Sequence, residues 1–173
     1  MYIKIFVCAG FLAASTMIGF TKARLLEQRV TRLCQWKRCL MLVQGSLRFH
    51  RAALWECFEE VSERAQEPFA SFFGKVSERL QKKEEGGLYH IWEEQSKELI
   101  GTGNFAKEDA PLLELLGESL GHLDLTMQMD QLELVLLQTD ENLRQAREQK
   151  EQKGKLYQTM GVTVGMLLVL LVI

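Results

Sequence analysis

The chain has 173 residues, of which 47% are apolar and 25% are charged, and its formal net charge is −2 at pH 7. These values exclude a disordered chain, which would be poorer in apolar residues, and a collagen-like chain, which would need more than 13 Gly and 2 Pro. They also argue against a free nucleic-acid-binding protein, which usually carries a basic excess.

The apolar residues gather at the two ends of the chain. Residues 5–20 and 156–173 contain no Asp, Glu, Lys or Arg. A helix rises about 1.5 Å per residue, so the C-terminal segment would span about 27 Å, close to the roughly 30 Å of a bilayer core. We therefore predict transmembrane helices over residues 1–21 and 156–173. For the first segment the alternative is a cleaved signal peptide, with Ala13-Ala14-Ser15 near the cleavage site.

Positive charges flank both apolar segments on their inner sides. Lys150, Lys153 and Lys155 precede the second segment, and a basic stretch with Glu27 as its single acidic residue follows the first: Lys22, Arg24, Arg29, Arg32, Lys37 and Arg38. A secretory signal would instead carry its positive charges before the apolar region, where this chain has only Lys4. Because positive flanks stay in the cytoplasm, we predict a membrane hairpin with residues 22–155 as a cytoplasmic domain.

Residues 22–155 show apolar spacing of helical type and no alternation long enough to predict a strand. We predict an all-α bundle of about five or six helices. The apolar stripes of its first three segments are Leu26, Val30, Leu33, Trp36, Leu40, Val43 and Leu47; Leu54, Phe58, Val61 and Ala65; and Phe69, Phe72, Phe73, Val76 and Leu80. The later stripes are Leu88, Ile91, Trp92 and Leu99, and then Leu112, Leu116, Leu120, Leu123, Met127, Leu134 and Leu137. Pro68 is expected in a first helical turn. Breaks are expected at residues 82–87 and 101–104, and Asp109 is expected to cap the next helix.

Residues with catalytic or ligand-binding potential are few and scattered. No phosphate-binding loop or complete dinucleotide motif is present, and His50, His90 and His122 fall on different predicted helices. The four cysteines, Cys8, Cys34, Cys39 and Cys57, lack zinc-ligand spacing and are expected to be reduced packing residues. We therefore predict no enzyme activity, cofactor or metal site. Acidic pairs such as Glu93-Glu94 indicate solvated helix faces or a contact for a basic partner.

One local pattern has two glycines and two leucines at i, i+4 spacing. It runs Leu116-Gly117-x-x-Leu120-Gly121-x-x-Asp124, and Gln128 follows Asp124 at the same spacing. Glycine costs a helix about 1 kcal/mol relative to alanine, so paired glycines suggest that another backbone approaches closely. Three interpretations are open: a tight helix crossing in the core, a partner-docking groove, or a break between two helices near Gly121.

A second glycine pair, Gly161 and Gly165, lies in the C-terminal apolar segment, where GxxxG spacing lets two helices approach closely. Gly10 and Ala14 offer the same spacing in the first segment. The pair is expected to pack the two spans together, or to pack one span against another subunit, which would form a homo-oligomer.

These features resemble the stage III sporulation protein AB family of endospore-forming bacteria over nearly the full length. The most specific part of the resemblance is the motif from Leu116 to Gln128. Further matches are Tyr157-Gln-Thr-Met-Gly161 and Gly165-Met-Leu-Leu near the C-terminus, Arg29-x-x-Arg32-Leu33 after the first apolar segment, and Trp92-Glu93 in the fourth predicted helix. The chain departs from the family pattern at residues 49–54, which contain neither Gly nor Pro.

The resemblance implies a soluble part similar to the cytoplasmic domain of the type II secretion platform protein F. It also implies a non-enzymatic platform subunit of a channel between mother cell and forespore. Its partners would be the stage III AA-type ATPase, other stage III A-series membrane proteins and the forespore protein Q, with the soluble domain in the mother-cell cytoplasm. The alternatives are a membrane-tethered regulator that binds a soluble signalling protein, and an enzyme with an unrecognised site.

Overall fold

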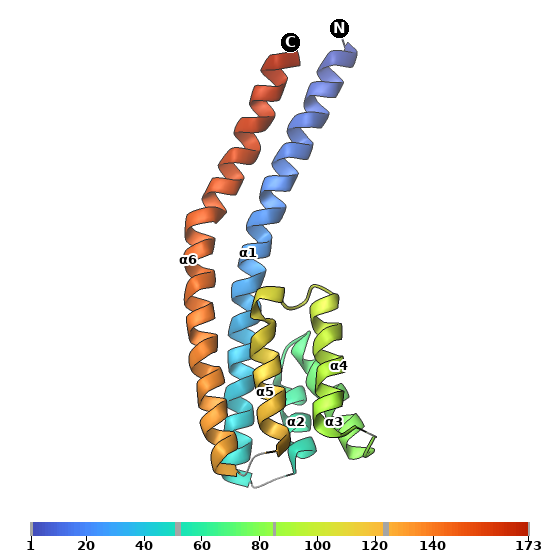
Figure 1. Cartoon of the computed structure of the whole chain (residues 1–173). Helices are drawn as coiled ribbons and strands as arrows, with labels where there is room; N and C mark the ends of the chain where they lie inside the picture. Colours follow the sequence, from blue (N-terminus) through green and yellow to red (C-terminus); the bar gives the residue numbers. More distant parts are fainter. Residues whose placement is uncertain (1, 51–52, 85, 123–124, 173) are drawn as a thin grey trace. The chain divides into compact units, whose positions relative to one another are not determined.

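The computed structural model describes residues 2–50, 53–84, 86–122 and 125–172 (Figure 1). Over these residues the chain is all-helical, as predicted, with six α-helices, one 3₁₀ helix and no strand. In chain order they are α1 (Tyr2–His50), α2 (Leu54–Arg64), α3 (Phe69–Gln81), α4 (Gly87–Gly101), η1 (Lys107–Asp109), α5 (Ala110–His122) and α6 (Leu125–Val172). The N-terminal apolar segment and the basic segment after it therefore belong to one helix, α1.

Among the residues that the structure describes, no helix is both long and apolar enough to cross a bilayer. The spans predicted over residues 1–21 and 156–173 stay a prediction.

Packing divides the chain into two units, one of residues 1–30 and 144–173 and the other of residues 31–143. In the first unit, α1 and α6 are joined by an ion pair between Lys150 Nζ and Glu27 Oε1 at 2.9 Å. A hydrogen bond from Arg29 Nη1 to Gln149 Oε1 at 3.1 Å lies nearby. The hydrogen bond from Lys150 lowers the pKa of the Glu27 carboxyl, which favours its charged form.

The second unit is built around a cluster of aromatic side chains. In it α2 packs against α3, α3 against α4, and α4 against α5 (Figure 1). Trp36 of α1 stacks on Phe73 of α3 with ring centroids 6.1 Å apart, and Phe72 meets Trp92 of α4 edge to face at 4.9 Å. Aromatic pairs in these geometries add about 0.5–1.5 kcal/mol each beyond the burial of their area. The cluster therefore ties α1, α3 and α4 to one core.

Most residues of the apolar stripes predicted for the first three helical segments lie in this core, whereas five are partly exposed: Leu26, Val30, Leu54, Ala65 and Leu80. Within α1 the predicted residues from position 33 onward are almost fully buried: Leu33, Trp36, Leu40, Val43 and Leu47. In α2 and α3 the fully or nearly fully buried residues are Cys57, Phe58, Val61, Phe69, Phe72, Phe73 and Val76. The 3.6-residue period of a helix thus places these side chains on one face, as the spacing predicts.

The breaks between the central helices fall where the sequence predicts them. Pro68, expected in the first turn, lies one residue earlier and directly precedes α3. After α3, Lys83 (φ 53°) and Gly86 (φ 101°) adopt left-handed backbone conformations, which end one helix before α4 begins. Gly103 (φ 73°) does the same after α4. Asp109 lies immediately before α5 with Pro111 in the first turn, and its carboxylate accepts a hydrogen bond from Asn142 Nδ2 at 2.9 Å.

The predicted stripe through the last segment is wrong at Met127, Leu134 and Leu137, and its member Leu123 lies outside the described residues. α5 ends at His122 and α6 begins at Leu125, although no proline separates them. The new helix starts with a different phase. As a result, Met127, Leu134 and Leu137 are 54%, 52% and 61% exposed, and the buried positions of α6 in this unit are Leu132, Val135, Thr139 and Leu143.

Candidate functional site

The first part of the Leu116–Gln128 motif, up to Leu120, belongs to α5, which packs against α4. Leu116 and Leu120 are almost fully buried, and Gly117 faces Trp92. A Cβ on Gly117 would lie 2.3 Å from Trp92 Cδ1, far inside van der Waals contact. The indole Nε1 also donates a hydrogen bond to the Leu113 carbonyl at 2.7 Å. The close neighbour of Gly117 is thus an aromatic side chain, where the sequence suggested a second backbone.

Gln128 connects the two sides of the break between α5 and α6. Its Nε2 donates a hydrogen bond to the Leu120 carbonyl at 3.0 Å. The last carbonyl groups of a helix lack partners within the helix, so this side chain satisfies one of them. The break itself agrees with the third interpretation of the motif. Asp124 lies outside the described residues.

Three further predicted residues, Gly121, Gly161 and Gly165, lie in α5 and α6, but their surroundings are outside what the structure describes. The predicted packing of the glycine pair in the C-terminal segment therefore stays a prediction.

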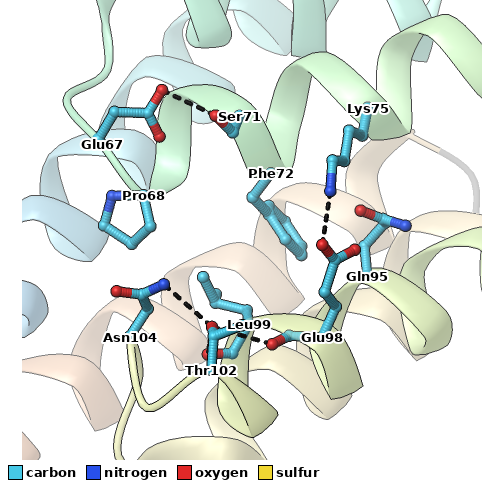
Figure 2. A pocket seen from close by; sticks show the side chains of 10 residues that line it. All are labelled: Glu67, Pro68, Ser71, Phe72, Lys75, Gln95, Glu98, Leu99, Thr102 and Asn104. Atoms are coloured by element: carbon cyan, nitrogen blue, oxygen red, sulfur yellow. Dashed lines mark hydrogen bonds and ion pairs between the residues drawn. The ribbon is translucent and has the colours of Figure 1, made fainter.

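A shallow cavity of about 170 Å³ lies between α3 and α4 (Figure 2). Pro68, just before α3, and Phe72 of α3 line one side of the cavity, and Leu99 of α4 also lines it. Two pairs of its polar side chains are hydrogen-bonded: Ser71 Oγ donates to Glu67 Oε1 at 2.7 Å, and Asn104 Nδ2 donates to Thr102 Oγ1 at 2.9 Å (Figure 2).

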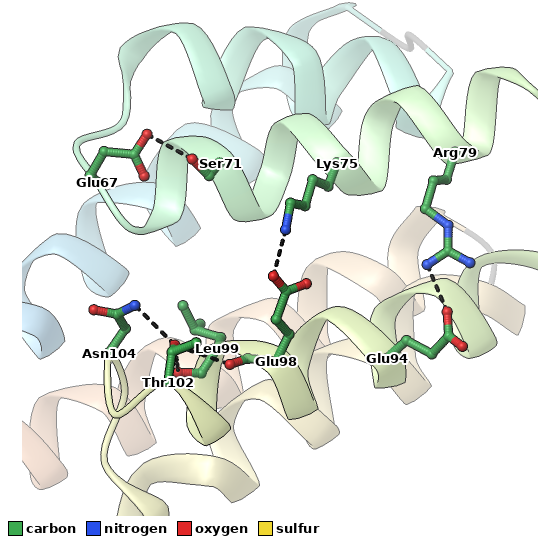
Figure 3. A network of polar contacts seen from close by, with 9 residues as sticks. All are labelled: Glu67, Ser71, Lys75, Arg79, Glu94, Glu98, Leu99, Thr102 and Asn104. Atoms are coloured by element: carbon green, nitrogen blue, oxygen red, sulfur yellow. Dashed lines mark hydrogen bonds and ion pairs between the residues drawn. The ribbon is translucent and has the colours of Figure 1, made fainter.

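The charges along this α3–α4 face are also paired (Figure 3). Lys75 Nζ lies 2.6 Å from Glu98 Oε1, and Arg79 Nη1 lies 2.7 Å from Glu94 Oε2. Arg79 also contacts Glu84 through Nε at 2.6 Å. Hydrogen bonds to Glu84 and Glu94 raise the pKa of Arg79, and the one from Arg79 lowers the pKa of Glu94. These ion pairs join the two helices, and each of the four residues Lys75, Arg79, Glu94 and Glu98 has its partner within the chain.

A second cavity, of about 190 Å³, lies between α4 and α5, and only some of its charged side chains are paired. We call it the α4–α5 groove; it is lined by Tyr89, Trp92, Glu93, Ser96, Lys97, Ile100, Glu114 and Glu118. Lys97 Nζ pairs with Glu93 Oε1 at 2.7 Å, which raises the pKa of Lys97. Among the described residues, the carboxylates of Glu114 and Glu118 have no hydrogen-bond or ion-pair partner.

The sequence pattern indicates Gly117, Trp92 and Glu93, but it did not lead to the groove residues Glu114 and Glu118 on either side of Gly117. A signal was available, because Glu114 and Glu118 are like charges at i, i+4 spacing, an arrangement that destabilises a helix. Which face of α4 lies opposite them depends on how the helices pack, and helical spacing alone does not supply that information.

The described part of the chain contains no group of three or more His, Cys, Asp or Glu residues placed to hold a metal ion. Cys39 and Cys57 are buried, and burial raises the pKa of Cys39 to about 12 and that of Cys57 to about 11. A thiol with such a pKa is protonated at neutral pH and is a poor nucleophile. Both cysteines therefore act as apolar packing residues.

The family model described as Stage III sporulation protein AB matches residues 4–173 of the chain. The Stage III sporulation protein AB of Bacillus subtilis (strain 168) is 22% identical to it over 169 residues, covering 98% of each chain. A solved structure of Stage III sporulation protein AB has a TM-score of 0.65 at 20% identity, and the match covers 71% of this chain and 96% of that one. At that identity the solved structure supports the fold. Since the family model spans nearly the whole sequence, the chain belongs to the stage III sporulation protein AB family.

Proposed function

We propose that the chain is a non-enzymatic platform subunit of a sporulation channel in the membrane between mother cell and forespore. The helical bundle would dock the stage III AA-type ATPase and other stage III A-series membrane proteins on the mother-cell side. The observation that carries the proposal is that one chain combines a helical bundle with two uncharged segments, residues 5–20 and 156–173. Membership of a sporulation protein family gives the process in which such a platform would act.

The charge pattern supports the proposed membrane orientation. The basic flanks beside both uncharged segments favour a cytoplasmic location for residues 22–155. Lys150 and Glu27, which join α6 to α1, lie just inside those segments, where paired charges would sit close to the membrane surface. Anchoring at both ends would hold the bundle at a fixed place on the membrane, as a docking platform requires.

The proposal is tested by purifying the tagged full-length chain from the membrane fraction of sporulating cells in a non-ionic detergent. Recovery of the AA-type ATPase together with other A-series proteins is expected. Recovery of a soluble signalling protein alone would overturn the platform role and favour the tethered regulator. A chain found entirely in the soluble fraction would overturn the membrane location.

A further inference from the structure

We propose that the α4–α5 groove is a docking site for a basic amphipathic helix of a protein partner, which inserts an arginine or lysine between Glu114 and Glu118. This inference deepens the proposed platform function, because it names the surface and the chemistry of docking. The groove's charge, its apolar floor and one buried hydroxyl support it.

The charge of the groove favours a cation. Glu93 and Lys97 neutralise each other, which leaves the carboxylates of Glu114 and Glu118 as its net charge. Both residues are exposed and lie at i, i+4 spacing on α5, so each raises the electrostatic energy of the other. A guanidinium or ammonium group between them would remove this repulsion and form charge-assisted hydrogen bonds.

The floor of the groove suits the aliphatic part of a long basic side chain. Trp92 and Ile100 line it, and Tyr89, 46% exposed, stands at its edge. Arginine and lysine lay their methylene stems along apolar surfaces while their charged ends stay in polar surroundings, and arginine also stacks on aromatic rings. The volume of about 190 Å³ lies below the roughly 300–1,000 Å³ of a small-molecule pocket, so an inserted side chain fits better than a cofactor.

Ser96 is an independent indication that something binds in the groove. It is only 5% exposed and lines the groove, yet among the described residues its hydroxyl has no hydrogen-bond partner. A buried hydroxyl without a partner destabilises the free protein. A polar group of the incoming helix would supply the missing hydrogen bond, so Ser96 should contribute to binding although it contributes nothing favourable to folding.

The α3–α4 face, on the other side of α4, serves as an internal comparison. There Lys75 and Arg79 pair with Glu98 and Glu94 within the chain (Figure 3). A basic partner would have to displace these cations before it could reach the carboxylates. The α4–α5 groove imposes no such competition at Glu114 and Glu118.

The test uses the full-length chain in a non-ionic detergent and a fluorescein-labelled peptide of about 18 residues, long enough to form a helix. Its helical face carries leucine and arginine, and a matched peptide carries neutral citrulline in place of arginine. Fluorescence anisotropy gives the Kd for each. We compare the wild type with Glu114→Gln/Glu118→Gln and with Glu59→Gln/Glu63→Gln. The second variant removes the same two charges at the same spacing from exposed positions on α2.

We expect the arginine peptide to bind the wild type, the groove variant to bind it about tenfold more weakly, and the α2 variant to match the wild type. Ser96→Ala should bind more weakly while melting at the same or a higher temperature. Equal losses in both glutamine variants, equal affinity for the citrulline peptide, or no binding to the wild type would each overturn the inference. Co-purification of the wild-type chain with channel proteins does not depend on these results, so the groove and the platform function can fail separately.

Discussion

Trp92 of α4 lies so close to Gly117 of α5 that a single added carbon on the glycine would stand 2.3 Å from the indole Cδ1. The indole is 2% exposed and also donates its N–H to the Leu113 carbonyl. The glycine therefore sets the distance between the two helices, and the tryptophan fixes that distance with both packing and a hydrogen bond.

Gly117→Ala should destabilise the protein although alanine is the better helix former. Alanine gains about 1 kcal/mol in helix propensity, whereas overpacking a tight core contact costs about 1–3 kcal/mol, and a 2.3 Å contact belongs at the upper end of that range. Circular dichroism of the full chain should show a lower melting temperature. Gly45→Ala is the matched control, because a Cβ there meets nothing within 4 Å. It should raise stability by about 0.5–1 kcal/mol. A Gly117→Ala protein as stable as the Gly45→Ala protein would contradict the close contact.

Trp92→Ala should relieve the effect of Gly117→Ala. The three atoms nearest to the added carbon, Cδ1, Nε1 and Cγ, all belong to the Trp92 side chain, and alanine lacks them. On its own the substitution removes the hydrogen bond to the Leu113 carbonyl and the buried indole, at a cost of about 3–5 kcal/mol. In a double-mutant cycle, the cost of Gly117→Ala should be smaller when Trp92→Ala is already present than in the wild type. Additive costs would show that the two residues do not interact.

Gln128→Ala should loosen the junction between α5 and α6. It removes the hydrogen bond to the Leu120 carbonyl, worth about 0.5–1.5 kcal/mol. Amide hydrogen exchange at the start of α6 should become faster while exchange in α2 and α3 stays the same. Gln138→Ala, at an exposed position of α6, is the control and should change neither region. Uniformly faster exchange across the bundle would mean that Gln128 contributes only to global stability.

Stability should fall at alkaline pH because of the two buried thiols. Burial raises the pKa of Cys39 to about 12 and of Cys57 to about 11, against an ordinary value of 9.0. Above pH 9 the unfolded chain ionises these thiols and the folded chain does not, so the stability they contribute below pH 9 is lost as pH rises through about 11 and 12. In urea titrations, Cys39→Ala/Cys57→Ala should be less stable than the wild type at pH 7 and should lose less stability between pH 9 and pH 11. Parallel curves for the two proteins would contradict the raised pKa values.

The sequence predicted the fold well where a helix's buried face follows from local spacing. Leu33, Trp36 and Leu40 recur at the helical period and are all fully buried. Likewise, the glycines near residues 86 and 103 mark real helix ends, because their left-handed backbone conformations are unfavourable for other residues. The family resemblance, based on the motif around Gly117 and Gly121, is confirmed by the family model.

The candidate site was harder to predict because it depends on how helices far apart in the chain pack together. The spacing of Gly117 and Gly121 indicates a close approach, but it cannot show that the neighbour of Gly117 is the Trp92 side chain. The groove likewise combines Ser96 of α4 with Glu114 of α5, and a pattern within one helix does not reveal that pairing. The break after His122 was one of three interpretations of the motif, and the sequence could not single it out because neither proline nor a run of turn residues marks it.

Between α5 and α6 the phase of the buried helical face changes, which gives two leucines of α6 opposite environments. Leu132 is fully buried and Leu134 is 52% exposed, although the apolar stripe predicted from α5 would have buried Leu134. Leu132→Ala should therefore lower the free energy of unfolding by about 2–5 kcal/mol, because it leaves a cavity. Leu134→Ala should change it by less than about 0.5 kcal/mol, as is usual for an exposed position. Both variants have the same composition and lie on the same helix, so general effects on helix propensity cancel in the comparison. Equal losses of stability in urea titrations would restore the continuous stripe and would contradict the restart of the helix at Leu125.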